Sequence, residues 1–272
     1  MSQVPPLPMV IEPSELEARL SDRQLLIIDL CNPQLYARAH IPGAVHVSPQ
    51  QLVAGTQPAT GKLPGIDQLE ALFSGLGYTG NEHIVVYDDE GGGWAGRFIW
   101  TLDVIGHHNY SYLNGGIHSW LKEGHPTDNT PGQKQPVAVS LSIDDSVIAS
   151  VEYILDSLDK DDVAIWDARS PGEYCGDKVL AMKGGHIPGA INFEWTRGMN
   201  PDNNLRIRAG LQEELSDLGL TKDKEIITHC QTHHRSGFTY LLARILGYEK
   251  VRAYDGSWSE WGNRQDTPVE CS

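Results

Sequence analysis

The chain carries one series of motifs twice, and this repetition sets the strongest limit on its fold. The residues His-Ile-Pro-Gly-Ala occupy positions 40–44 and again positions 186–190. An apolar run that ends in a polar residue at 84–88 matches the run at 226–230, an offset of 226 − 84 = 142. In a chain of 272 residues, two copies of that length predict a duplicated globular domain, because the repeats of solenoids are far shorter.

Each copy alternates short β-branched runs with helical patterns, which is typical of a mostly parallel sheet flanked by helices. The expected strands are 25–30, 83–87, 163–166 and 226–229, and the expected helices are 97–105, 147–158 and 238–246. Residues 124–137 are rich in proline and small polar residues, as linkers are. We therefore predict an α/β protein of two tandem domains, 1–124 and 147–272, joined by a linker at 125–146.

The most informative single residue is Cys230, which ends the apolar run of the second copy shortly before a helical pattern begins. Parallel sheets bind ligands at this carboxyl end of their strands. The free N–H groups of the helix start favour a thiolate, and Arg235 and a protonated His233 or His234 would add to the effect. An inert core cysteine is the plainer interpretation, but the polar side chains of Arg235, His233 and His234 would be unfavourable beside a cysteine in the core. The sequence predicts an activated nucleophile in a partly wet loop, with a pKa below ~8.5.

The first copy has Asp88 where the second has Cys230, and the acidic residues Asp89 and Glu90 follow it. We expect the first domain to be catalytically inactive and its acidic loop to repel the anions that the second domain attracts. The glycines at 91–96 fit the G-x-G-x-x-G dinucleotide pattern, but the acidic residue that this fingerprint needs after the next strand is missing. We interpret the loop as a structural relic of a catalytic loop.

Charge and composition exclude several classes of function. The net charge of −15 is shared, since residues 1–136 carry 7 Lys/Arg against 14 Asp/Glu and residues 137–272 carry 14 against 22. Such a surface repels nucleic acids and anionic membranes. The segment Met1–Glu12 lacks the features of a signal peptide, and no apolar run could span a bilayer, so we expect a cytoplasmic protein. Four cysteines in this length are not a disulfide framework.

Taken together, the duplicated domain, the repeated His-Ile-Pro-Gly-Ala, the run Tyr254–Trp258 and the single cysteine loop resemble a tandem-domain rhodanese. The loop Cys230–Arg235 is most similar to that of a bacterial thiosulfate sulfurtransferase of this type. The resemblance implies that Cys230 takes the outer sulfur of an anionic donor such as thiosulfate, that sulfite leaves, and that the persulfide passes its sulfur to cyanide or a thiol. It implies no metal and no organic cofactor, and it allows a protein that donates or accepts persulfide sulfur as a partner.

The loop residues around Cys230 form the expected donor site. Inward-pointing backbone N–H groups would stabilise thiolate and persulfide alike. Arg235 keeps its charge and can grip two oxygens, so we assign it to the donor anion. Ser236 offers a hydroxyl, as Thr232 does, and is also a candidate N-cap of the following helix. The predicted substrate-binding residues are Arg235, Gln231, Thr232, His233, His234 and Ser236. Two roles stay open for the histidines: donor binding at the rim, or solvated loop positions that add mild positive potential.

Two positions depart from the pattern of the family and leave the donor open. Gln231 and Thr232 stand where thiosulfate-type rhodaneses commonly carry basic residues, and Glu173 stands where many tandem members carry an arginine. Thiosulfate is the first expected donor, 3-mercaptopyruvate the second, and a protein persulfide or a selenium species the third.

Three other functions fit the sequence less well. A cysteine phosphatase or arsenate reductase on the same fold is the nearest rival, but phosphatases use Cys-x5-Arg, whereas Cys230 and Arg235 form Cys-x4-Arg. A metal site built from His229, Cys230, His233 and His234 would need successive strand side chains, which point to opposite faces, to reach one ion. A non-catalytic scaffold is the last alternative, and it is the role expected for the first domain.

Overall fold

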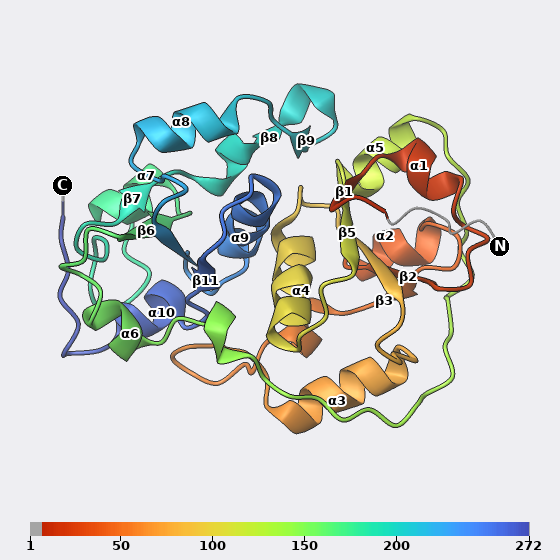
Figure 1. Cartoon of the computed structure of the whole chain (residues 1–272), viewed down its shortest axis with the longest axis horizontal. Coiled ribbons are helices and arrows are strands. Elements are labelled where there is room, and N and C mark those ends of the chain that lie inside the picture. Colours follow the sequence, from red (N-terminus) through yellow and green to blue (C-terminus); the bar gives the residue numbers. More distant parts are fainter. Residues whose placement is uncertain (1–6, 272) are drawn as a thin grey trace.

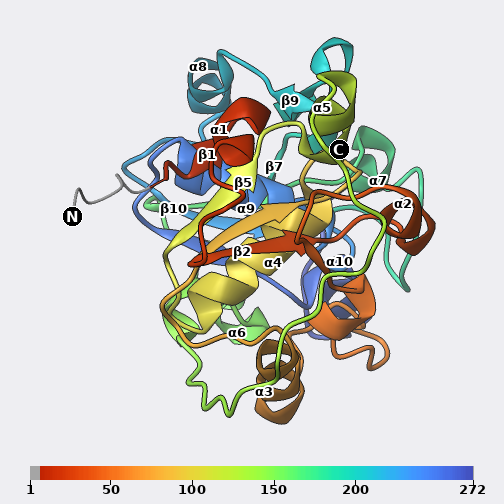
Figure 2. The ribbon, with the colours of Figure 1, turned by 90° about the vertical axis from the view of Figure 1, so that its right-hand side faces the viewer.

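A computed structural model of the chain describes residues 7–271. Two domains lie side by side along the long axis of the molecule (Figure 1). Figure 2 views the molecule from the end formed by the first domain, with α1 and α5 on one side of the strands and α3 on the other. Among the residues that the structure describes, no helix is both long and apolar enough to cross a bilayer.

The first domain is built on a parallel sheet with the strand order β1-β5-β4-β2-β3. Its strands are β1 Val10–Ile11, β2 Leu25–Asp29, β3 Val45–His46, β4 His83–Tyr87 and β5 Tyr110–Leu113. Its helices are α1 Pro13–Glu17, α2 Pro33–Arg38, α3 Ile66–Gly75, α4 Gly93–Val104 and α5 Gly116–Lys122. The strands β2 and β4 are buried almost throughout, which explains their β-branched runs without polar alternation.

The second domain repeats this plan with a parallel sheet of the order β11-β10-β6-β7. Its strands are β6 Val163–Asp167, β7 Ile191–Asn192, β10 Glu225–His229 and β11 Val251–Ala253, with an antiparallel pair of β8 Met199–Asn200 and β9 Arg206–Ile207. Its helices are α6 Val151–Leu155, α7 Pro171–Cys175, α8 Leu211–Asp217, α9 Arg235–Ile245 and α10 Ser257–Trp261. The predicted α/β architecture is therefore confirmed.

The predicted helix bounds were less accurate than the predicted strands. The helix α4 begins at Gly93, not at residue 97, and α9 begins at Arg235, not at residue 238. Both helices start with mostly small or polar residues outside the apolar repeat, and most of these first-turn residues are nevertheless buried. The helix predicted over 147–158 is confined to Val151–Leu155.

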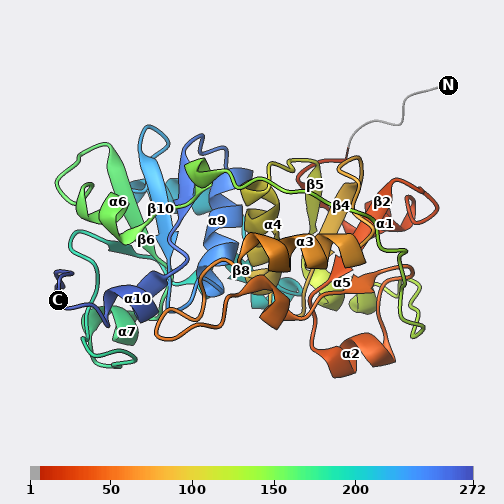
Figure 3. The same ribbon diagram turned by 90° about the horizontal axis from the view of Figure 1, so that it is seen from below.

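The two domains share a packed interface formed by α4 and α9, which lie next to each other between the two sheets (Figure 3). The helices touch at Gly96 and Gly237, where a Cβ on Gly96 would overlap the backbone of Gly237 and a Cβ on Gly237 would lie 2.5 Å from the Arg97 nitrogen. One hydrophobic cluster runs through this contact, from the first sheet to the second. The loops that follow β4 and β10 precede these two helices, so both loops reach the interface.

Candidate active site

Cys230 lies directly after β10, where the backbone is held by the start of α10. The Trp258 N–H donates to the Cys230 carbonyl at 2.9 Å, and the Ser259 N–H donates to the Gln231 carbonyl at 2.9 Å. The Cys230 N–H donates to the hydroxyl of Ser257 at 3.3 Å. Cys230 is only 1 % exposed, although Gln231, Thr232, His234 and Arg235 are partly exposed, so the loop is partly wet as expected but its cysteine is buried.

The Cys230 thiolate is stabilised in spite of this burial. Burial alone would raise the pKa of the thiol, but the charge of Arg235, the hydroxyl and N–H of Ser236 and the N–H of Thr232 all act in the other direction. The net result is a pKa below the ordinary value for cysteine, as the sequence predicts. Backbone and hydroxyl donors therefore replace the solvent that the buried anion has lost.

Arg235 does not point freely toward solvent. Its Nη1 and Nη2 donate to the two carboxylate oxygens of Glu173 at 2.7 and 2.8 Å. Burial would raise the pKa of Glu173, but the bonds from Arg235 and from the Ser170 hydroxyl hold it at about 2. Glu173 is the residue found where many tandem rhodaneses carry an arginine, and here it positions the arginine of the cysteine loop. The guanidinium of Arg235 is therefore already paired with a carboxylate in this structure. Its role in donor binding stays a prediction.

His233 is fully buried, which excludes a solvated role for it. Its Nδ1 lies 2.7 Å from the Ser236 hydroxyl, and its ring meets Trp100 of the first domain edge-on at 4.6 Å. Burial lowers the pKa of His233 well below its usual value, with the charge of Arg97 acting in the same direction, so the ring is neutral at physiological pH. It therefore adds no positive charge to the loop. Because the Ser236 hydroxyl donates to the thiolate, the neutral ring must donate its Nδ1 proton to Ser236.

His234 lies at the interface with the first domain. Its ring stacks on Trp94 at a centroid distance of 4.4 Å and tilts against Trp195 at 5.7 Å. Its Nε2 is 2.6 Å from a carboxylate oxygen of Glu90, and its side chain is 23 % exposed. The acidic loop of the first domain thus contacts a histidine of the cysteine loop directly.

The other predicted residues of the loop serve different purposes. The Gln231 side chain donates to the Leu180 carbonyl at 3.2 Å, which links the loop to the segment between α7 and β7. Thr232 acts through its backbone N–H, and its carbonyl packs against Gly61 so closely that a side chain there would overlap it. Ser236 lies inside α9 and not at its N-cap, a position that His234 occupies without a side-chain cap bond. The prediction of Ser236 as a helix cap was wrong.

Like the cysteine loop, the loop after β4 forms a cradle, a set of inward-pointing backbone N–H groups, and it holds the carboxylate of Asp88. The carboxylate of Asp88 accepts backbone N–H bonds from Glu90 at 3.1 Å, Gly92 at 2.8 Å and Ala95 at 3.0 Å. Side chains on Gly91, Gly92 and Gly93 would collide with Met199, Phe238 and His234 of the second domain. The glycine run is therefore explained by close packing against the second domain, without any need for a dinucleotide.

Several residues that lie close to the cysteine loop could not be recognised from the sequence. Arg97 and Asp255 are buried near the cysteine loop. The negative charges of Asp255 and Cys230 stabilise the charged form of the Arg97 guanidinium. The hydrogen bond from the Cys230 N–H to the Ser257 hydroxyl was also not predicted. The run Tyr254–Trp258 contributed to the family resemblance but gave no sign of the contact of Ser257 with Cys230.

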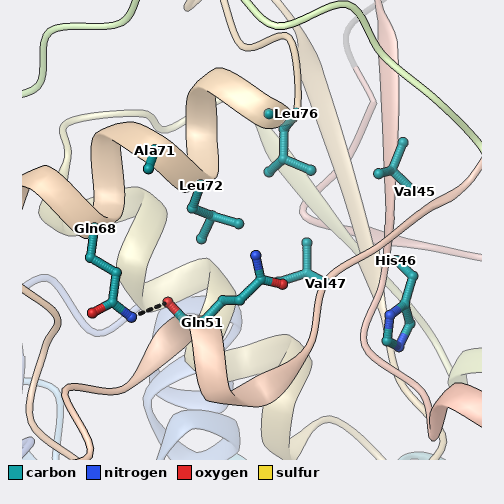
Figure 4. Close-up of a pocket in the computed structure, with 9 residues that line it drawn as sticks. Val45, His46, Val47, Gln51, Gln68, Ala71, Leu72 and Leu76 are labelled. Atoms are coloured by element: carbon teal, nitrogen blue, oxygen red, sulfur yellow. Dashed lines mark hydrogen bonds between the residues drawn. The ribbon is translucent and has the colours of Figure 1, made fainter.

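No metal centre forms among residues 7–271, where no three His, Cys, Asp or Glu side chains are placed to hold an ion. His229 is buried, with its Nε2 3.5 Å from Asp167, and burial lowers its pKa to about 4. A separate hollow lies in the first domain between α3 and β3 (Figure 4). Its lining residues include Val45, Gln51 and Leu72 but no nucleophile, so the cysteine loop is the candidate site.

Comparison with known proteins agrees with this geometry. The model of the rhodanese-like domain family matches residues 12–123 and 150–264. The chain belongs to the rhodanese family and contains two tandem copies of its domain.

Individual relatives extend the comparison. The chain is 56 % identical over 270 residues to a thiosulfate sulfurtransferase of Pseudomonas aeruginosa, covering 99 % of this chain and 100 % of that protein. It is 56 % identical to a thiosulfate sulfurtransferase of Azotobacter vinelandii, over 97 % of each chain. It is 32 % identical to the sulfur carrier protein TtuD of Thermus thermophilus, over 86 % of each.

Proposed function

We propose that this protein is a thiosulfate sulfurtransferase in which Cys230 carries the transferred sulfur. The observation that carries the proposal is a buried cysteine whose pKa is lowered by Arg235 and by donors from Ser236 and Thr232. The thiolate attacks the outer sulfur of thiosulfate, the bond between the two donor sulfurs breaks, and sulfite leaves with its electron pair. Cyanide or a thiolate then attacks the outer sulfur of the persulfide, and the Cys230 thiolate is restored.

Each loop residue has a proposed role in this cycle. The N–H groups of Thr232 and Ser236 stabilise the anionic sulfur in the thiolate and in the persulfide. Arg235 binds the sulfonate oxygens of the donor, oriented by its bidentate pair with Glu173. Gln231 and His234 line the rim of the site, whereas the neutral His233 orients the Ser236 hydroxyl.

The division of labour between the domains is part of the proposal. Residues 1–124 form the non-catalytic domain, residues 125–146 the linker and residues 147–272 the catalytic domain. Asp88 supports this division, because it fills the first cradle with a carboxylate that cannot accept sulfur.

The donor, the partners and the location are proposed more broadly. 3-Mercaptopyruvate is the second candidate donor, since the charge that it needs is the same Arg235. The likeness to a sulfur carrier protein supports a protein that donates or accepts persulfide sulfur as a partner. A cytoplasmic location fits four free cysteines and an activated thiolate, which a reducing compartment keeps available.

Intact-mass measurement tests the proposal directly. The protein is incubated with thiosulfate, with 3-mercaptopyruvate or with neither, and the mass gain of one sulfur atom is followed before and after cyanide. We expect thiosulfate to load one sulfur on the peptide that contains Cys230. The variants Cys31→Ser and Cys175→Ser serve as controls and should load normally. Loading by 3-mercaptopyruvate alone would replace the donor, and loading on Cys230→Ser would overturn the site.

A further inference from the structure

The first domain places a buried cation against the cysteine loop. Arg97, in α4, is fully buried. Its Nη2 donates to the Leu52 carbonyl at 2.7 Å, and its guanidinium lies over the Trp100 ring at 4.5 Å. Its Nε and Nη1 are buried with no hydrogen-bond partner among residues 7–271. Unpaired buried guanidinium donors are unfavourable, so their retention needs an explanation.

The residues that surround Arg97 also contact the cysteine loop or the helix that follows it. Its backbone packs on Gly237 of α9, and Trp100, which its guanidinium covers, also contacts His233. Residues 52–63 of the first domain close over the same region, because Leu52 binds Arg97 and Gly61 packs on Thr232.

Few charges compensate this cation. Burial lowers the pKa of Arg97 to about 10, and the groups that act in the other direction are the Asp255 carboxylate and the Cys230 thiolate. Asp255 also accepts the Leu63 N–H at 2.7 Å. The further groups that act on Cys230 or Arg97 are Arg235 with its partner Glu173, and the neutral His233.

We propose that Arg97 is a positioning residue of the catalytic site, supplied by the domain that has no catalytic cysteine. Its buried charge stabilises the anionic sulfur on Cys230, as thiolate and as persulfide, and compensates in part for the loss of solvent. Each of the two buried charges would be unfavourable alone, and together they offset each other. This inference rests on the proposed function of Cys230 as the sulfur carrier, and it explains why the non-catalytic domain is packed against the cysteine loop.

The test compares the pH dependence of Cys230 alkylation by iodoacetamide in the full chain freed of persulfide. In Arg97→Met the inflection should rise by about one pH unit, because a nearby opposite charge shifts a thiol pKa by about 1–3 units. Arg97→Lys keeps the charge and should shift the inflection less than Arg97→Met. Asp255→Asn removes the carboxylate that competes for Arg97, so its inflection should fall.

A merely structural role for Arg97 predicts a different pattern. It would lower the melting temperature of Arg97→Met and leave the inflection in place. Arg244→Met is the matched control, because Arg244 also lies at the domain interface, 3.9 Å from Asp103, and its removal should not move the inflection.

An unmoved inflection in Arg97→Met overturns the inference. If Arg97→Met does not fold, the other two variants decide, and an unchanged or raised inflection in Asp255→Asn overturns it. Failure of the proposed function is a distinct result, since the wild-type protein would then take no sulfur onto Cys230 from thiosulfate.

Discussion

The loops after β4 and β10 are two versions of one anion cradle, and they differ in the anion that they hold. In the first, the Asp88 carboxylate accepts three backbone N–H groups. In the second, the Cys230 thiolate accepts N–H groups from Thr232 and Ser236. The first loop has Gly93 five residues after its anion, where the second has Arg235. We infer from this difference that catalysis needs a nucleophilic anion and an adjacent cation in addition to the N–H groups of the cradle.

Replacing the nucleophile is the largest test of this comparison. Cys230→Ser should lower sulfur transfer from thiosulfate to cyanide by ~10³-fold or more, as removal of a covalent nucleophile does in other enzymes. Adding Asp88→Cys to this variant should not restore activity, since the first loop lacks a cation at position 93. Thiocyanate formation measures both. Activity regained in the double variant would mean that the cradle alone suffices.

The two buried cysteines of the two domains give the next test. Cys31 and Cys230 are both 1 % exposed and both follow a parallel strand. Burial and the charges of Asp29, Asp89 and Asp88 raise the pKa of Cys31 well above the usual value, whereas the pKa of Cys230 is lowered. At pH 7.5 we expect iodoacetamide to label Cys230 much faster than Cys31, because the lowered pKa gives Cys230 more of the reactive thiolate and the raised pKa keeps Cys31 as the thiol. Peptide mapping over time measures the ratio, and similar rates would show that burial outweighs the neighbours.

The third test removes the cation of the second cradle. Arg235→Ala should lower kcat/KM for thiosulfate by ~10- to 100-fold, because a charge-assisted contact contributes about 1.5–3 kcal/mol. Arg235→Ala leaves the buried Glu173 carboxylate without its partner. The double variant Arg235→Ala with Glu173→Gln removes that unpaired charge, so it separates the loss of donor binding from the effect of the unpaired carboxylate. Arg208→Ala is the control, an arginine on the same domain that pairs with Glu214 away from the cysteine. If the double variant recovers full kcat/KM, Arg235 does not bind the donor.

The sequence revealed the parts of the molecule that depend on neighbours along the chain. The duplication, the parallel strands and the place of Cys230 at a strand end follow from patterns within short segments. The lowered pKa of Cys230 could also be predicted, because its main donors lie within six residues of it.

The contacts between distant segments were not predictable in the same way. The neutral state of His233 depends on its burial, to which Trp100 of the other domain contributes, and on the charge of Arg97. The partner of Arg235 is Glu173, 62 residues away. The spacing of apolar and polar residues along the sequence does not indicate such pairs of distant residues. The acidic Glu90 was expected to repel donors, and its contact with His234 emerges only when the domains are packed together.

The smallest expected effect concerns stability, and it follows from the Arg235–Glu173 pair that the first cradle lacks. The pKa of Glu173 falls from an ordinary 4.5 to about 2 in the folded protein. A depressed carboxyl pKa stabilises the fold above pH 4.5 and loses this contribution as the pH falls toward 2, because the unfolded chain binds the proton first. The urea midpoint of the wild-type protein should therefore decrease over this interval, and Glu173→Gln should start lower and decrease less. Glu249→Gln, at an exposed position, should follow the wild type. Parallel curves for Glu173→Gln and the wild type would mean that Arg235 does not hold this carboxylate in its charged form.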